Sequence, residues 1–207
     1  MMKHIVITIG RELGCGGKEI AEKIADRLGI KFYDKKLLEA AARESGIDTT
    51  IFEEADEKES HTFIGNMFSI HGSLANVLSG VSCFDEDKLF EIQSEAIRNI
   101  AAKESCIIVG RCAEYILRDH PDLISIFITA DNEERVKRIM KSEGLEHEKA
   151  VEFIEKSDRR RRQYHDYYAT TKWGEAHSYD LCINSSRLGI DGTVDAIQRF
   201  VCAHYGL

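Results

Sequence analysis

The chain has 207 residues and a net charge of −8, with 43% hydrophobic and 31% charged residues. These values are typical of a globular protein with one sizeable core, and the acidic balance argues against general nucleic-acid binding. No apolar run approaches the roughly 20 residues of a membrane span, and no signal-peptide pattern is found. The six cysteines show no C-x-x-C pairing and indicate buried thiols. We therefore expect no membrane or nucleic-acid partner and a cytoplasmic location.

The first 34 residues carry the most informative pattern. The apolar run at 4–9 predicts a buried strand, which leads into the glycine-rich segment 10–18 and then into an amphipathic helical pattern. A strand, a glycine-rich turn and a lysine at a helix N-terminus are typical of a phosphate-binding loop, because backbone N–H groups converge there. The candidate phosphate-binding residues are Gly14, Cys15, Gly16, Gly17, Lys18 and Glu19.

The match to the pattern G-x-x-x-x-G-K-[ST] is incomplete. Counted back from Lys18, Glu12 stands at the first glycine, and Glu19 stands where a Ser or Thr usually binds Mg²⁺. A tight turn without a ligand is therefore an alternative for the loop taken alone. Lys18 favours the phosphate-binding interpretation, because a cation at a helix N-terminus is unfavourable unless an anion lies there.

The rest of the chain alternates apolar runs with helical patterns, which predicts a parallel sheet covered by helices. Strands are expected near 4–9, 31–33, 105–109, 123–129 and 179–183. Helices are expected near 17–28, 35–46, 86–103, 112–118, 132–142, 147–168 and 190–204. Asp85 and Asp131 are the predicted N-caps of two of these helices.

Two segments interrupt the alternation. Residues 47–84 are polar and rich in small residues, which is typical of a functional flap or of a partly disordered segment. The helical pattern 147–168 forms a second insertion before the last strand. Two insertions around a phosphate loop indicate lids that exclude water during group transfer. His61 and His71 have no partners at metal-ligand spacing, so we expect no metal site formed by the protein itself.

Four consecutive arginines occupy positions 159–162 of this acidic chain. On a helix they point in several directions, so not all of them can face one ligand, and a solvated helix face is the simple alternative. Guanidinium groups are nevertheless the preferred binders of phosphate oxygens. Arg159 and Arg162 are three residues apart and hence share one face, which makes them the candidate pair.

With these features in place, the chain resembles the cytidylate kinase-like family of P-loop nucleoside monophosphate kinases over nearly its full length. The segments that carry the resemblance are 10–18, 32–38, 107–111, 126–130 with Arg135, 158–168 and 179–184. The resemblance implies an α/β, three-layer P-loop NTPase fold with a five-stranded parallel sheet of order 2-3-1-4-5 and helices on both faces. It implies a single kinase domain over 1–207, with an acceptor-side insertion at about 35–104 and a lid insertion at about 143–174.

The family activity is transfer of the γ-phosphoryl group of ATP, with Mg²⁺, to a nucleoside monophosphate such as CMP or dCMP. By resemblance, residues 14–19 would wrap the β-phosphate, Lys18 would bridge to the γ-phosphate, and Arg159 and Arg162 would be catalytic lid arginines. Asp34, Arg43 and Arg111 would bind the acceptor. Alternatives stay open for several of these, because Asp34 fits a helix N-cap, Arg111 a surface salt bridge and Arg43 an ordinary helix face. Asp158 could instead hold Arg162 within the helix.

Cys112 follows Arg111 where similar kinases have an aspartate, and a thiol scarcely accepts a hydrogen bond from a cytosine amino group. Together with Glu12 and Glu19, this residue supports a rival interpretation: a nucleotide-binding regulatory protein without transfer activity. A kinase for another small phosphate acceptor is the second alternative. The expected partners are small-molecule nucleotides, and a homodimer is compatible with the sequence.

Overall fold

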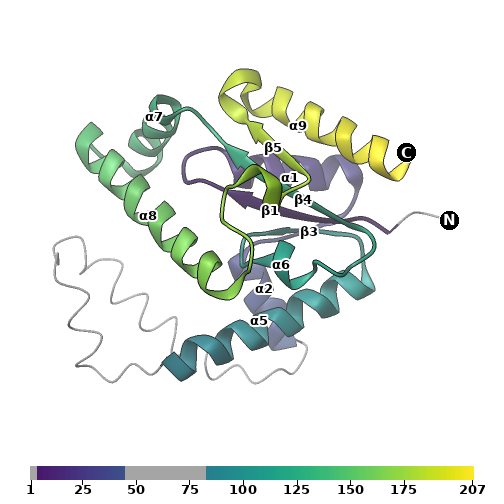
Figure 1. Ribbon diagram of the computed structural model, residues 1–207. Helices are drawn as coiled ribbons and strands as arrows, with labels where there is room; N and C mark the ends of the chain where they lie inside the picture. The colour runs from purple at the N-terminus through teal and green to yellow at the C-terminus, as the bar shows by residue number, and fades with distance from the viewer. Residues whose placement is uncertain (1–3, 45–82) are drawn as a thin grey trace. The chain divides into compact units, whose positions relative to one another are not determined.

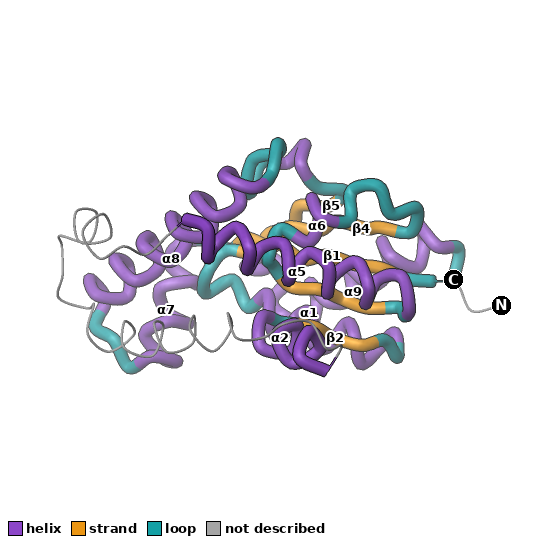
Figure 2. Tube along the Cα trace, turned by 90° about the horizontal axis from the view of Figure 1, so that it is seen from below, coloured by secondary structure: helices purple, strands orange, loops and turns teal. Residues whose placement is uncertain are grey.

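The computed structural model describes residues 4–44 and 83–207. Its strands are β1 (Val6–Arg11), β2 (Lys31–Tyr33), β3 (Cys106–Val109), β4 (Leu123–Thr129) and β5 (Leu181–Asn184). All of them pair in parallel in one sheet of order β2-β3-β1-β4-β5, which confirms the expected topology. Figure 2 shows the strands running side by side, so that their carboxyl ends lie along one edge of the sheet.

The helices are α1 (Gly17–Leu28), α2 (Lys35–Glu44), α5 (Cys83–Lys103), α6 (Ala113–Ile116), α7 (Asn132–Glu143), α8 (His147–Tyr168) and α9 (Ser185–Tyr205), with a short 3₁₀ helix at Ala176–Ser178. Asp85 lies inside α5, so its prediction as an N-cap is wrong. Asp131 is the N-cap residue of α7, although its carboxylate accepts a hydrogen bond from Asn184 rather than from the helix. Gly189 (φ 67°, ψ −178°) is not helical and divides α9 by a kink, so the helix predicted near 190–204 corresponds to the part of α9 that follows the kink.

The chain divides into two compact units. One comprises Met1–Lys35 with Ile97–Leu207 and contains the whole sheet; the other comprises Lys36–Ala96. The flap expected at 47–84 falls almost entirely outside the described residues. The side chain of Arg43 also lies outside the described part of the chain.

The core lies between the sheet and two helices. Ile5, directly before β1, and Ile7 and Ile9 within it belong to a buried cluster. To this cluster α1 contributes Ile20 and Ile24, and α9 contributes its apolar side. Figure 1 shows α1 and α9 on this face of the sheet and α6 on the other. Burial on both faces explains why these strands read as nearly continuous apolar runs. This packing fixes the β1–α1 turn, where the candidate site lies.

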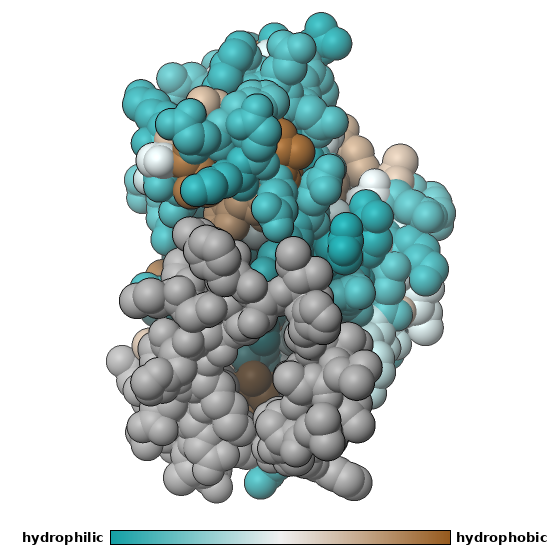
Figure 3. Space-filling model, turned by 90° about the vertical axis from the view of Figure 1, so that its left-hand side faces the viewer, coloured by the Kyte–Doolittle hydropathy of each residue, from teal (hydrophilic) through white to brown (hydrophobic). Residues whose placement is uncertain are grey.

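Helices α7 and α8 pack against each other through a second, smaller cluster of Val136, Ile139, Ala150 and Ile154. A left-handed glycine, Gly144 (φ 67°), ends α7 and reverses the chain. The face that carries these helices is largely hydrophilic where it is described (Figure 3). Most of the charged residues of α8 are therefore solvated.

The predicted burial of the cysteines is confirmed for Cys15, Cys106 and Cys112 but is wrong for Cys182, which is exposed. Cys182 lies in β5, an edge strand of the sheet, so one side of its apolar run remains open. No helix of the described residues is both long and apolar enough to cross a membrane.

Candidate active site

The turn from β1 to α1 has the backbone geometry of an anion-binding loop. Gly14 (φ 79°) and Gly16 (φ 80°) are both left-handed, and they flank Cys15. Residues that alternate in this way turn successive N–H groups toward one point, and the N-terminus of α1 adds its partial positive charge. A Cβ at Gly14 would lie 2.8 Å from the Arg135 carbonyl oxygen, and one at Gly16 would lie 2.3 Å from Ile190 Cδ1. Gly14 is therefore required by close packing against backbone as well as by φ, whereas Gly16 is required mainly by φ, because the terminal Cδ1 of Ile190 can move.

Cys15 takes part in this loop only through its backbone. Its side chain is fully buried in the core, and burial raises the pKa of the thiol to about 11. The carbonyl of Cys15 accepts a hydrogen bond of 2.7 Å from Ser185 Oγ, at the start of α9. This hydrogen bond anchors the loop to the start of α9.

Lys18, the second residue of α1, is paired with Asp34, which follows β2. Lys18 Nζ lies 2.9 Å from Asp34 Oδ2 and 3.8 Å from Glu22 Oε1. The hydrogen bond and charge of Asp34 raise the pKa of Lys18. The Lys18 side chain is 63% exposed and that of Asp34 only 18%. Sequence reasoning singled out both residues but did not anticipate that they form a pair.

The loop is held to α7 and α8 by a buried ionic network centred on Arg135. Arg135 Nε donates to the Leu13 carbonyl (2.8 Å), while the Leu13 N–H donates to Asp158 Oδ1 (2.8 Å). The Arg135 guanidinium also pairs with Asp158 and lies 3.4 Å from Glu12 Oε2. Glu12 in turn accepts a hydrogen bond from Thr129. The backbone N–H and the carbonyl of Leu13 are therefore both bound by one ion pair, the N–H by Asp158 and the carbonyl by Arg135.

This network and one pair on the surface account for the acidic residues of the loop. The carboxylate of Glu12 is bound by Arg135 and Thr129, and Glu19 pairs with Lys23 at 3.0 Å. Neither carboxylate is an uncompensated charge beside the N-terminus of α1. Asp158 holds the loop, so the alternative in which it pairs with Arg162 is wrong.

Two further arginines, Arg11 and Arg161, meet at the loop; sequence reasoning gave Arg11 no role and chose Arg159 and Arg162 from the cluster that contains Arg161. Arg11 is the last residue of β1, and its carbonyl accepts a hydrogen bond of 3.1 Å from Arg161 Nη1 of α8. Burial and the charges of Arg161 and Arg111 lower the pKa of Arg11 to about 10. Arg11 stands inside the quoted loop motif, but nothing in the local pattern distinguishes it from a surface arginine.

Arg111 lies in an unusual turn after β3. Arg111 (φ 61°) and Cys112 (φ 54°) are consecutive left-handed residues that are not glycine, a conformation that is costly and is found mostly at functional sites. The Arg111 guanidinium lies 4.6 Å from the centre of the Tyr164 ring of α8. Cys112 is buried, and burial raises the pKa of its thiol to about 12, so it offers a ligand neither a charge nor a good acceptor.

The arginines at 159–162 diverge, as expected for four consecutive helical residues. Arg159 and Arg162 both line a cavity of about 490 Å³ beside α7 and α8, and Arg162 lies 5.6 Å from the centre of the Trp173 ring. Arg160 is exposed, and Arg161 turns toward the loop. The two expected lid arginines therefore share one face, whereas the arginine that bonds the loop is Arg161.

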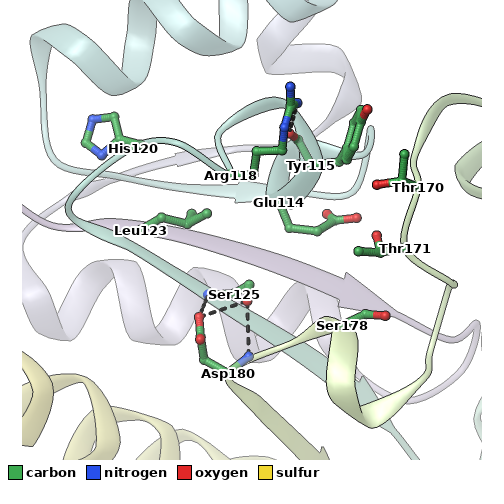
Figure 4. Close-up of a pocket in the computed structure, with 10 residues that line it drawn as sticks. All are labelled: Glu114, Tyr115, Arg118, His120, Leu123, Ser125, Thr170, Thr171, Ser178 and Asp180. Atoms are coloured by element: carbon green, nitrogen blue, oxygen red, sulfur yellow. Dashed lines mark hydrogen bonds between the residues drawn. The ribbon is translucent and has the colours of Figure 1, made fainter.

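A second cavity, of about 290 Å³, lies beside the start of β4 and is lined by residues from α6 and from the segment before β5. Figure 4 shows Asp180 bound to Ser125 at its base, with Glu114 pointing into it from α6. Ser125 Oγ and the Ser125 N–H both donate to Asp180 Oδ2 at 2.8 Å, so this carboxylate joins β4 to the start of β5. The cavity contains none of the loop residues and is separate from the candidate site.

His165 fixes α8 to α6 through a buried ion pair, which predicts a pH dependence of stability. Its Nε2 lies 2.8 Å from Glu114 Oε1 and its Nδ1 3.2 Å from Asp166 Oδ1. Burial lowers the pKa of His165, but the hydrogen bonds and charges of the two carboxylates raise it more. The pair therefore stabilises the fold fully below the unfolded-state pKa of about 6.5, and this contribution is lost as the pH rises through the higher folded-state value.

We expect the melting temperature of the wild type to fall between about pH 6 and about pH 9 by more than that of His165→Gln, as measured by calorimetry. The exposed His177→Gln is the matched control and should keep the wild-type slope. Equal slopes for the wild type and His165→Gln would contradict this prediction.

A left-handed glycine loop at the start of a helix, in a parallel sheet of order 2-3-1-4-5, is typical of the fold of P-loop kinases. The model of the cytidylate kinase-like family matches residues 6–187, and the chain belongs to this family. The protein is thus a nucleotide-binding phosphotransferase of the kinase class.

The chain is also similar to individual proteins and solved structures. The chain is 25% identical over 208 residues to a cytidylate kinase of Methanopyrus kandleri, covering 95% of this chain and 93% of that protein. A crystal structure of an uncharacterized protein from Eubacterium ventriosum is 32% identical, with a TM-score of 0.72 and coverage of 96% and 98% of the two chains. Shikimate kinase from Bacteroides thetaiotaomicron shares the fold, at 14% identity, a TM-score of 0.55 and coverage of 95% and 98%.

Proposed function

We propose that this protein transfers the γ-phosphoryl group of ATP to a nucleoside monophosphate, with CMP or dCMP as the first choice. The observation that carries the proposal is the convergence of loop, cation and acceptor residues at one sheet edge. The loop follows β1, Asp34 follows β2 and Arg111 follows β3, and these three strands are neighbours. Ligands of open α/β sheets gather at the carboxyl ends of such strands.

The loop would bind the donor phosphates. The N–H groups of residues 14–19 would donate hydrogen bonds to the β-phosphate. Lys18, which pairs with Asp34 in this structure, would bind a donor phosphate in place of that carboxylate. Arg159 and Arg162 would act as lid arginines from the cavity beside α8. Arg111 and Asp34 would bind the acceptor.

The chemistry needs no general base. The acceptor phosphate is already ionised, so one of its oxygens attacks the γ-phosphorus while the bond to the bridging oxygen breaks and ADP leaves. The protein contributes positioning and charge neutralisation. Mg²⁺ would offset the negative charge of the donor phosphates. Since Glu19 stands where a hydroxyl usually binds Mg²⁺, ATP oxygens and water would supply most of the ligands of the ion.

The choice of acceptor is supported by family and by the relative named cytidylate kinase. The buried thiol of Cys112 is not a cytosine-binding carboxylate, so other residues would select the base. We therefore propose the reaction class on the loop geometry and the pyrimidine acceptor on the relatives. The partners on this proposal are small-molecule nucleotides.

A coupled ADP-release assay with ATP, Mg²⁺ and each of CMP, dCMP, UMP, AMP and GMP tests both parts. We expect ADP release that depends on one pyrimidine monophosphate. Release with a purine monophosphate alone would keep the reaction and replace the acceptor. Silence across the panel, with ATP still raising the melting temperature, would favour the nucleotide-binding regulatory protein.

Arg111→Ala should raise the KM of the acceptor about 10- to 100-fold while changing the KM of ATP little, because a guanidinium–phosphate contact on the acceptor side is lost. The matched control is Arg118→Ala, since Arg118 also stacks on a tyrosine (4.4 Å from the Tyr115 ring centre) but lines the separate cavity. Steady-state kinetics with each substrate varied in turn measure both constants. Equal rises in the two KM values would remove Arg111 from the acceptor site.

A further inference from the structure

The path of the Arg11 side chain is set by two glycines. A Cβ at Gly17, the first residue of α1, would lie 2.9 Å from Arg11 Cβ and 3.0 Å from Arg11 Cγ. A Cβ at Gly110, directly after β3, would lie 2.1 Å from Arg11 Nη1 and 3.1 Å from Arg11 Cζ. The side chain therefore crosses the N-terminus of α1 and places its guanidinium against the turn that carries Arg111. It joins the donor loop to the acceptor side of the proposed site.

Arg161 approaches the same place from α8. Its Nη1 donates to the Arg11 carbonyl at 3.1 Å, and burial lowers its pKa as it lowers that of Arg11. The carboxylate charge that raises the pKa of Arg11 is that of Asp34, and the one that raises the pKa of Arg161 is that of Asp158. Both are already paired, Asp34 with Lys18 and Asp158 with Arg135. No carboxylate of the described side chains forms an ion pair with Arg11 or Arg161.

Such an arrangement is electrostatically incomplete. Two partly buried guanidinium groups and the positive end of α1 repel one another, and the repulsion is strongest where water is displaced. Arginine is also the side chain best suited to bind phosphate oxygens through two parallel hydrogen bonds. An anion with more than one negative charge would turn this repulsion into attraction.

We propose that Arg11 and Arg161 form a two-arginine clamp for a phosphoryl group held in the β1–α1 loop. The clamp takes a polyphosphate anion, such as the β- and γ-phosphates of a nucleoside triphosphate, with Arg11 on the side facing β3 and Arg161 on the side facing α8. It acts in addition to Lys18, Arg159 and Arg162. The inference rests on the proposed function to the extent that a phosphorylated donor occupies the loop.

Inorganic pyrophosphate is the probe for this clamp, because it needs neither an acceptor nor turnover. Isothermal titration calorimetry should show that Arg11→Gln and Arg161→Gln each bind pyrophosphate about 10- to 100-fold more weakly than the wild type. Arg160→Gln is the matched control, since it removes the same charge from an exposed neighbour in the same helix, and it should bind like the wild type. Pyrophosphate affinity that is unchanged in Arg11→Gln, or absent in the wild type, would overturn the clamp.

A second readout separates binding from folding. Without an anion, Arg11→Gln should melt at the same temperature as the wild type or higher, because one of two repelling charges is gone; with pyrophosphate only the wild type should be stabilised strongly. A purely structural role for Arg11 predicts the reverse, a lower melting temperature without the anion. If Arg11→Gln does not fold, Arg161→Gln decides the same question.

The clamp and the proposed kinase activity fail separately. Silence in the ADP-release assay together with pyrophosphate binding that depends on Arg11 would remove the kinase activity and retain the clamp. Normal transfer by Arg11→Gln would remove the clamp and retain the kinase.

Discussion

Replacing Arg135 by alanine is expected to lower the free energy of unfolding by about 3 kcal/mol. The Arg135 side chain is 6% exposed and compensates Asp158 and Glu12, so its loss leaves partly buried carboxylates without a cation. The effect should fall at the lower end of the range for broken buried ion pairs, because water reaches Glu12. Unfolding in guanidinium chloride, followed by circular dichroism, measures this loss.

The matched control for Arg135 is Lys137→Ala in the same helix. Lys137 Nζ pairs with Glu134 at 2.8 Å on an exposed surface, where solvent screens the interaction, so no measurable change is expected. Equal losses for the two variants would show that the Arg135 network does not carry the stability assigned to it. Arg135→Ala should also impair nucleotide binding, since the Leu13 peptide loses the group that holds it.

Lys18→Ala is expected to lower kcat by about 10²- to 10³-fold while leaving the melting temperature nearly unchanged. The proposed role of Lys18 is to stabilise charge on the transferring phosphoryl group, and its side chain is 63% exposed and contributes little to packing. Steady-state kinetics at saturating ATP and acceptor measure the effect on kcat.

The control for Lys18 is Lys23→Ala, one turn further along α1, where Lys23 pairs with Glu19 and Asp191 on the surface. This variant should turn over at the wild-type rate. Near-normal kcat in Lys18→Ala would show that Lys18 is not catalytic. Stabilisation of the transferring phosphoryl group would then be assigned to the arginines.

Much of the fold could be predicted because local sequence patterns indicate its strands, helices and turns. The apolar run that contains Ile5, Ile7 and Ile9 predicts a buried strand, and the glycines at 14 and 16 predict a tight turn after it. The strand order followed from the family resemblance rather than from these patterns. Where a local pattern misled, a specific cause is visible: β5 is an edge strand, which leaves Cys182 exposed.

The candidate site was only partly predictable, because its decisive contacts join residues far apart in the chain. The Leu13 N–H and Asp158 are 145 residues apart, and the Arg11 carbonyl and Arg161 are 150 apart. Which of four consecutive arginines turns inward depends on the rotation of α8 about its axis. That rotation is set by the apolar contacts of Ala150 and Ile154 with α7, which no local pattern around 159–162 contains.

By itself the sequence determined most of the elements, the buried faces and the glycine-rich turn between β1 and α1, since periodicity and glycine positions act locally along the chain. Only the tertiary structure decided that Asp34 pairs with Lys18, that Glu12 and Asp158 hold Arg135, and that Arg11 meets Arg161. The reason is physical: the energy of a charged side chain depends on which charges and how much water surround it in space. Those surroundings exist only once the helices have packed on the sheet.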